Sequence, residues 1–269
     1  MRTRSIHGKL TQLSNLRVSQ WRGFIEAWLL RGSSGSVPCV IPGSGRILLI
    51  PVREFYETYW FFAESRQGIR EIEFFLRRLR PGDVVFDIGA FRGAYGAGAK
   101  AVLGDAVSVH LFEPIQNNIE GIRAVAVLNS FSGFEIVSKA VGSGSTIRGM
   151  LNSEAAMLRR GDTTQGLRAV EFPSTSLDVY IQDTGVAPTV VKVDVEGFEL
   201  DVLEGARHLL SSHRPRLWIE VHPSYLKAQG HRWEELTGRL NAVGYRTLTF
   251  FEDYDLPTRD ISFHLWCEF

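Results

Sequence analysis

From residue 66 onward, short apolar runs alternate with segments whose apolar residues recur three and four positions apart. The short runs predict strands, and the longer periodic segments predict amphipathic helices. The expected strands are 83–88, 105–112, 134–141, 189–193 and 216–221. The expected helices are 67–80, 94–103, 115–129, 176–183, 199–212 and 233–243. This alternation predicts an α/β fold with a mostly parallel sheet that helices cover on both faces.

Two segments depart from the alternation. Residues 246–251 and 261–268 are both strand-like, and no helix is expected between them. Such a connection favours an antiparallel hairpin at the edge of the sheet. Residues 147–172 are less regular, and we expect an insertion with short strands there.

The first 65 residues follow a different pattern and are expected to form an N-terminal extension to a main domain of residues 66–269. Apolar side chains at helical spacing, from Val18 to Leu29, lie among basic residues and predict an amphipathic helix. That helix could dock on the main domain or on a second subunit, contact a membrane surface or an acidic partner, or cover the substrate. Residues 37–41 and 46–52 are expected to form a β-hairpin.

The composition limits the possible functions. The 30 basic and 30 acidic residues cancel, and the pI is near 7, so no basic field indicates a nucleic-acid partner. The amino-terminal sequence has no secretory h-region, and no segment approaches the roughly 20 apolar residues of a membrane span. Cys39 and Cys267 have no metal or redox spacing. We therefore expect a cytoplasmic protein.

The segment that follows the first expected strand has the features of a cofactor-binding turn. Asp87 ends the strand, and Gly89, Ala90 and Gly93 occupy the turn before a helix of small residues. Glycine at such positions lets a ligand approach the backbone. The second glycine of the dinucleotide pattern is missing, which favours a cofactor without phosphates, such as S-adenosylmethionine, over NAD. A tight turn without a ligand is the alternative.

Glu113 lies 20 residues after Gly93, at the end of the second expected strand. A carboxylate at this place can accept hydrogen bonds from both ribose hydroxyls of a nucleoside. A carboxylate that simply favours the start of the following helix is the alternative.

Further acidic residues and a histidine follow the fourth and fifth expected strands. Asp194 ends an apolar strand, where a carboxylate is costly unless it meets a ligand, a metal or a donor. Glu220 and His222 share one side of the next strand tip. We expect these three residues to converge, with His222 as the general base that Asp194 orients. A divalent metal bound by Asp194, Glu220 and His222 is the second hypothesis. Glu199 could equally cap its helix or take part in catalysis.

Together these segments resemble the FkbM-type methyltransferases. The matching segments follow the family's order at 83–93, 112–114, 176–178, 192–199, 203–206 and 220–222. The resemblance implies a Rossmann-like class I methyltransferase sheet that binds S-adenosylmethionine. It also implies that Asp87, Gly89, Gly93 and Glu113 line the cofactor. Phe91 and Arg92 stand where the family often has a small polar residue, which puts the contacts to the methionine end of the cofactor in question.

The function that this resemblance implies is methylation of a hydroxyl on a sugar, a polyketide or a similar natural product. The acceptor would be a small molecule or a glycan. Two alternatives stay open: a catalytically silent S-adenosylmethionine-binding protein that acts through its N-terminal helix, and an NAD-dependent oxidoreductase.

Overall fold

The computed structural model describes residues 35–55, 66–152, 157–159, 168–249 and 262–269. The predicted amphipathic helix and the predicted domain boundary near residue 65 lie outside these residues, as does any oligomer or membrane contact through that helix. Among the described helices, none has the length and apolar character that crossing a lipid bilayer requires.

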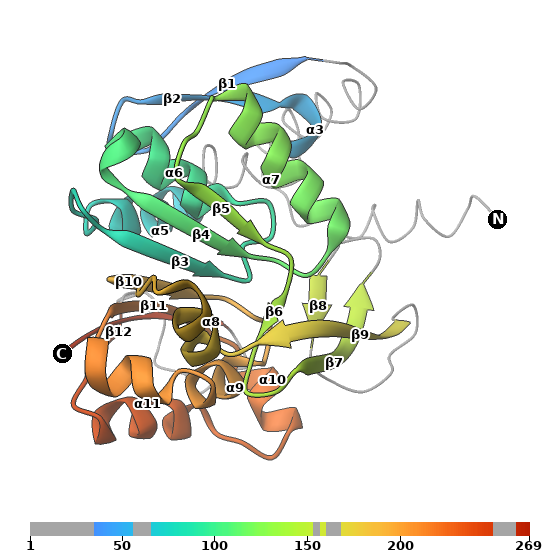
Figure 1. The fold of residues 1–269 in the computed structure, drawn as a ribbon, viewed down its shortest axis with the longest axis vertical. Helices are drawn as coiled ribbons and strands as arrows, with labels where there is room; N and C mark the ends of the chain where they lie inside the picture. The colour runs from blue at the N-terminus through green and yellow to red at the C-terminus, as the bar shows by residue number, and fades with distance from the viewer. Residues whose placement is uncertain (1–34, 56–65, 153–156, 160–167, 250–261) are drawn as a thin grey trace.

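A seven-stranded sheet forms the centre of the molecule, in the order β12-β13-β11-β10-β3-β4-β5 (Figure 1). The strands are β3 (Val84–Ile88), β4 (Ser108–Phe112), β5 (Phe134–Val137), β10 (Val190–Val193), β11 (Arg216–Val221), β12 (Arg246–Thr249) and β13 (Phe263–Glu268). The five strands from β5 to β11 in this order are parallel, and β13 is antiparallel to both of its neighbours. The predicted α/β Rossmann-like sheet and its terminal antiparallel hairpin are confirmed. The chain's last strand inserts between β11 and β12 rather than adding at the outer edge.

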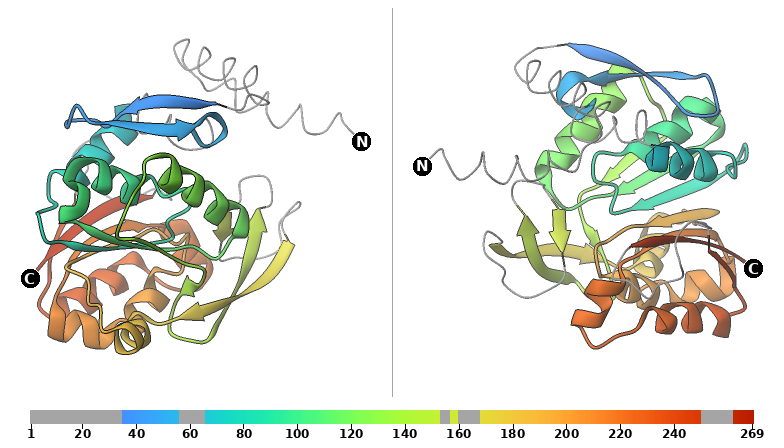
Figure 2. Two further views of the ribbon diagram at one scale, coloured as in Figure 1. Left: turned by 45° about the horizontal axis from the view of Figure 1, so that its top comes forward. Right: turned by 180° about the vertical axis from the view of Figure 1, so that it is seen from behind.

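Helices cover both faces of this sheet (Figures 1 and 2). On one face lie α5 (Arg66–Leu76), α6 (Ala94–Leu103) and α7 (Gln116–Leu128), and on the other lie α8 (Leu177–Thr184), α9 (Glu199–Glu204) and α11 (Trp233–Ala242). A short helix, α10 (Pro223–Ala228), was not predicted; it begins at the proline that follows β11. Proline fits the first helical position because its missing N–H has no partner there anyway.

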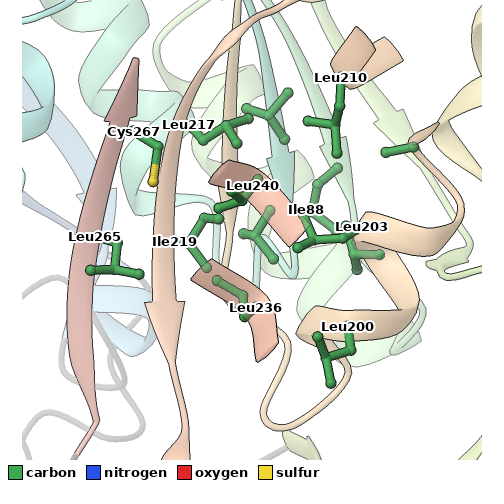
Figure 3. Packing of buried hydrophobic residues seen from close by; sticks show 14 of the residues in the cluster. Ile88, Leu200, Leu203, Leu210, Leu217, Ile219, Leu236, Leu240, Leu265 and Cys267 are labelled. Atoms are coloured by element: carbon green, nitrogen blue, oxygen red, sulfur yellow. The ribbon is translucent and has the colours of Figure 1, made fainter. Parts of the chain in front are cut away.

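The second face carries the larger share of leucine packing. Ile88 and Ile219 project from the sheet against Leu203 of α9 and Leu240 of α11, as Figure 3 shows. These side chains are almost completely buried. Because side chains alternate along a strand, the burial of these residues fixes which face of each strand packs against the helices.

The predicted helix 199–212 is divided in the structure. Helix α9 ends at Glu204, and a π-helical turn follows at Leu209–His213. A Cβ atom on Gly205 would lie 2.2 Å from the carbonyl oxygen of Gly142, so only glycine lets the two segments approach this closely where α9 ends. The Asp178 carboxylate accepts hydrogen bonds from the backbone N–H groups of His208 and Leu209. Contacts from other segments, which periodicity does not report, therefore interrupt the helix.

The expected insertion with short strands is confirmed as a separate four-stranded sheet, in the order β6-β9-β7-β8. Its strands are β6 (Ala140–Val141), β7 (Thr146–Asn152), β8 (Met157–Arg159) and β9 (Arg168–Thr175). The predicted strand 134–141 is thus divided between β5 of the central sheet and β6 of this one. The small sheet projects from the side of the molecule, next to the carboxyl ends of the central strands (Figure 1).

The predicted N-terminal hairpin is confirmed as β1 (Ser36–Val40) and β2 (Ile47–Pro51), followed by one helical turn, α3 (Val52–Glu54). The hairpin lies across the outer side of α6 and α7 (Figure 2). Its buried residues Cys39, Leu48 and Ile50 belong to the same apolar cluster as α5 and α6.

A buried ion pair joins this hairpin unit to the central sheet. Arg92 of the β3–α6 loop lies 2.8 Å from the Glu54 carboxylate, and both side chains are less than a tenth exposed. The same guanidinium donates to the carbonyl oxygen of Asn117 at the start of α7. A Cβ atom on Gly121 would lie 2.4 Å from the Glu54 carboxylate, so the helix needs glycine there to admit the pair.

We expect Glu54→Gln to lower the free energy of unfolding by about 3 kcal/mol, because it removes the negative charge that lies 2.8 Å from the buried Arg92 guanidinium. Urea denaturation measures the change. Glu171→Gln is the control: it breaks the exposed pair with Arg148 and should cost less than about 1 kcal/mol. Equal effects of the two substitutions would contradict a structural role for the buried pair.

Candidate active site

The β3–α6 loop holds the tips of three strands together. The backbone N–H groups of Gly89 and Ala90 both donate to the carbonyl oxygen of Phe112 at the end of β4. Gly89 has φ 72°, and a Cβ atom there would lie 1.9 Å from the carbonyl oxygen of Asp194 after β10. Glycine is therefore required by the approach of the protein's own backbone, a reason that the sequence did not reveal.

Three of the residues predicted to bind cofactor lie behind this loop. Asp87 is fully buried, and Ala90 is 5% exposed. Gly93 has φ 76° and begins α6, where a side chain would press on Leu111 and Ile122 at 3.2 Å. None of the three lines the cavity described below. These three residues are packed inside the protein, beneath the β3–α6 loop.

A buried lysine connects the tips of β3 and β10. The Lys192 ammonium lies 3.3 Å from a carboxylate oxygen of Asp87, 3.3 Å from one of Asp194, and donates to the carbonyl oxygen of Gly89 at 3.1 Å. Burial alone lowers the pKa of Lys192, but the Asp194 and Asp87 carboxylates outweigh it and raise that pKa above its usual value. The lysine is therefore a permanent cation.

A cavity opens at the carboxyl ends of β3, β4 and β10, beside the small sheet. Its wall includes Gly89, Phe91, Glu113, Ile147, Asp194 and Phe198. Two of the predicted cofactor residues, Gly89 and Glu113, are thus part of it. Most of the remaining wall is apolar, which suits a flat heterocyclic ring.

Glu113 is the buried carboxyl group among the described residues of this cavity's wall. Its carboxylate accepts hydrogen bonds from the backbone N–H groups of Phe91 and Ile115, both at 2.9 Å, and from the Asn118 amide at 3.1 Å. Burial raises the pKa of Glu113 to about 7, against these hydrogen bonds. Since a carboxylate offers about four acceptor positions, roughly one stays open to a ligand.

The three residues predicted to converge do so. One ligand atom each from Asp194, Glu220 and His222 lie within 4.8 Å of one another. The Nε2 atom of His222 is 3.6 Å from Glu220, 3.8 Å from Glu196 and 4.0 Å from Asp194. We call Asp194, Glu196, Glu220 and His222 the carboxylate–histidine cluster. Asp194 and Glu196 also line the cavity, so the two sites adjoin.

Glu199 orients the imidazole, a role that helix-capping arguments missed. Its fully buried carboxylate accepts from Nδ1 of His222 at 2.7 Å and from the backbone N–H of Gly197 at 3.0 Å. Burial by itself lowers the pKa of His222, but the hydrogen bond to Glu199 and the charges of Glu220 and Asp194 raise it to about 10. Without another cation in the cluster, His222 is protonated near neutral pH, which counts against it as a general base.

Comparison with known families identifies the protein family of this chain. The model of the methyltransferase FkbM domain matches residues 87–247, which include the β3–α6 loop, Glu113 and the whole cluster. The chain belongs to the FkbM methyltransferase family. The resemblance seen in the sequence is therefore confirmed over this range. No curated protein sequence matches the chain.

Several solved structures are similar in fold. An FkbM methyltransferase from Methylobacillus flagellatus KT is 22% identical with a TM-score of 0.48, and the match covers 80% of this chain and 54% of that one. This chain thus spans about half the length of that relative. Precorrin-6y C5,15-methyltransferase from Geobacter metallireducens GS-15 is 12% identical, with a TM-score of 0.46 and coverages of 76% and 89%. M. jannaschii TYW2, solved with AdoMet, is 12% identical, with a TM-score of 0.47 and coverages of 88% and 86%.

The cavity of this FkbM family member fits the nucleoside part of S-adenosylmethionine. The apolar wall formed by Phe91, Ile147 and Phe198 suits an adenine ring, and the open acceptor position of Glu113 suits a ribose hydroxyl. Among the described residues of its wall, Gly89 is the only glycine, and a Cβ atom there would meet the Asp194 carbonyl oxygen, so these residues form no glycine-lined pyrophosphate cradle.

We expect Lys192→Met to lower the free energy of unfolding by about 3 to 5 kcal/mol, since it leaves the buried Asp87 carboxylate without its cation. Chemical denaturation measures the loss. The matched control is Lys227→Met on the exposed side of α10, which should change stability little. Adding Asp87→Asn to Lys192→Met should restore part of the loss, and failure to restore any would contradict the pairing.

Glu113 should make stability depend on pH. Its pKa is about 7 in the folded protein and about 4.5 in the unfolded chain, so the folded state holds a proton that the unfolded state releases between these pH values. Stability from this group therefore falls as pH rises from 4.5 to 7, by about 3 kcal/mol at 1.36 kcal/mol per pH unit. Denaturation of the wild type and Glu113→Gln across this range tests it. Parallel pH profiles would contradict the shifted pKa.

Proposed function

We propose that this protein is an S-adenosylmethionine-dependent O-methyltransferase whose acceptor is a hydroxyl of a sugar, a polyketide or a similar natural product. The observation that carries the proposal is the adjacency of two sites. The first site is an apolar cavity with one buried carboxyl group, Glu113, and the second is the carboxylate–histidine cluster. Asp194 belongs to both sites. Membership of the FkbM family supports the cofactor.

Glu113 would hold the cofactor through a ribose hydroxyl at its open acceptor position. Its other contacts, to Phe91, Ile115 and Asn118, keep the carboxylate fixed before the ligand arrives. A preorganised acceptor loses little conformational freedom on binding. Asp87 and Gly93 would act indirectly by supporting the loop.

The carboxylate–histidine cluster would hold the acceptor. When bound, S-adenosylmethionine supplies the methyl group as an activated sulfonium, so the protein's task is to align the acceptor oxygen and to exclude water. Asp194 and Glu220 are placed to bind the acceptor hydroxyl and to take its proton. His222, kept cationic by Glu199, would balance their charge rather than act as the base.

We expect the protein to bind S-adenosylmethionine and not NAD in isothermal titration calorimetry. Glu113→Ala should weaken S-adenosylmethionine binding by about 1.5 to 3 kcal/mol, the scale of a hydrogen bond to a charged group. Glu120→Ala, on the exposed side of α7, is the matched control and should leave the affinity unchanged.

Two results would overturn parts of this proposal. Tight binding of NAD without a response to S-adenosylmethionine would exclude the methyltransferase. Unchanged affinity in Glu113→Ala would place the ribose elsewhere. Methyl transfer from labelled cofactor to a panel of hydroxylated acceptors then separates an enzyme from a silent binding protein.

A further inference from the structure

The carboxylate–histidine cluster combines a buried imidazole with three carboxylates from two strand tips. His222 is 8% exposed, and Glu199 fixes its ring so that Nε2 faces Asp194, Glu196 and Glu220. No described residue lies within hydrogen-bonding distance of that Nε2 atom. The Nε2 atom of a mostly buried imidazole therefore points, without a hydrogen-bond partner among the described residues, into a group of oxygens.

The spacing of these atoms is too wide for hydrogen bonds and suits an ion between them. A hydrogen-bonded imidazolium and carboxylate approach to about 2.8 Å, whereas the three carboxylate oxygens stand 3.6 to 4.0 Å from Nε2. Two donors that each lie about 2.1 Å from one octahedral ion are about 3.0 to 4.2 Å apart. The observed distances fall within that interval.

The hydrogen bond at Nδ1 of His222 is of the kind that metal-binding histidines make. A histidine that binds a metal usually donates its other ring N–H to a carboxylate, which fixes the tautomer and orients the ring. Nδ1 of His222 makes this contact with Glu199 at 2.7 Å. Glu199 is itself held by the backbone N–H of Gly197, so the orientation is built into the β10–α9 turn.

We propose that Asp194, Glu220 and His222 bind one divalent cation of the Mg²⁺ or Mn²⁺ kind, with Glu196 beside it and Glu199 as a positioning residue. The proposal rests on the proposed function, because the cation would lie next to the acceptor rather than the cofactor. It changes one role: with the metal bound, His222 is neutral at Nε2, and the metal supplies the positive charge that the protonated imidazole supplies without it. Carboxylates select such hard cations, and an imidazole favours Mn²⁺ among them. Three protein donors leave about three of six positions for acceptor oxygens or water.

The charges of the region favour a cation. Lys192 lies beside Asp87 and Asp194, whereas Glu196, Glu199 and Glu220 lie around His222. His264 lies 3.5 Å from Glu220, but burial lowers its pKa to about 3, so it adds no positive charge. Lys192 already has two of the five carboxylates within 3.3 Å. Besides a metal, a protonated His222 or an ammonium group of the acceptor could balance the negative charge of the cluster. The experiment below distinguishes these cases.

Titration of the full-length protein with Mn²⁺ alone, followed by electron paramagnetic resonance, tests the site. We expect one saturable Mn²⁺ per chain, with spin-echo modulation from an imidazole ¹⁴N. Asp194→Asn and Glu220→Gln should each weaken binding by at least about tenfold, and Glu199→Gln by about 10- to 100-fold. Glu204→Gln, an acidic residue at the end of α9 outside the cluster, is the control and should bind Mn²⁺ as the wild type does.

Calorimetric binding of S-adenosylmethionine is measured in the same variants to separate the two proposals. The metal site is supported if Glu220→Gln, whose residue does not line the cavity, keeps cofactor affinity while it loses Mn²⁺. It is overturned if the wild type binds the cofactor but no Mn²⁺, or if bound Mn²⁺ shows no nitrogen coupling and is unaffected by Glu220→Gln. Mn²⁺ binding with these properties in a protein that does not bind S-adenosylmethionine would retain the metal and refute the methyltransferase.

Discussion

The buried ammonium of Lys192 is the interaction on which the site depends. It brings two carboxylates from neighbouring strands, Asp87 and Asp194, to the same point and also binds the carbonyl oxygen of Gly89. Without the lysine, two acidic strand tips would repel each other in a region that excludes water. With it, β3 and β10 can end close enough for the Gly89 backbone to contact that of Asp194. The Lys192 ammonium thus positions both the β3–α6 loop and Asp194 of the carboxylate–histidine cluster.

Much of the fold could be predicted because each central strand is a short apolar run that ends in a recognisable turn. The convergence of Asp194, Glu220 and His222 followed from the same argument, since adjacent parallel strands end at one edge. The roles of individual residues were harder to predict. Gly205 lies in close contact with the Gly142 backbone where α9 ends, and Glu199 is hydrogen-bonded to a histidine 23 positions later. Such contacts depend on which segments touch, which periodicity does not specify.

Several residues that mark the family in the sequence serve the framework. Ser176 accepts a hydrogen bond from the N–H of Val179 and begins α8. Asp178, two residues later, caps the segment that restarts after α9. Gly93 begins α6 in a left-handed conformation. Residues of a family's sequence signature can therefore stabilise the framework of the fold.

The two residues that depart from the family pattern link the N-terminal extension to the cavity. Phe91 adopts φ 51°, lines the cavity and donates its N–H to Glu113. The next residue, Arg92, turns the other way and is buried against Glu54 of the extension. Because consecutive residues make these two contacts, a shift of the hairpin that displaced Glu54 would be transmitted to the Glu113 carboxylate through one peptide unit. The described hairpin unit, β1 to α3, is therefore in a position to influence the cavity through Glu54, although none of its own described residues lines that cavity.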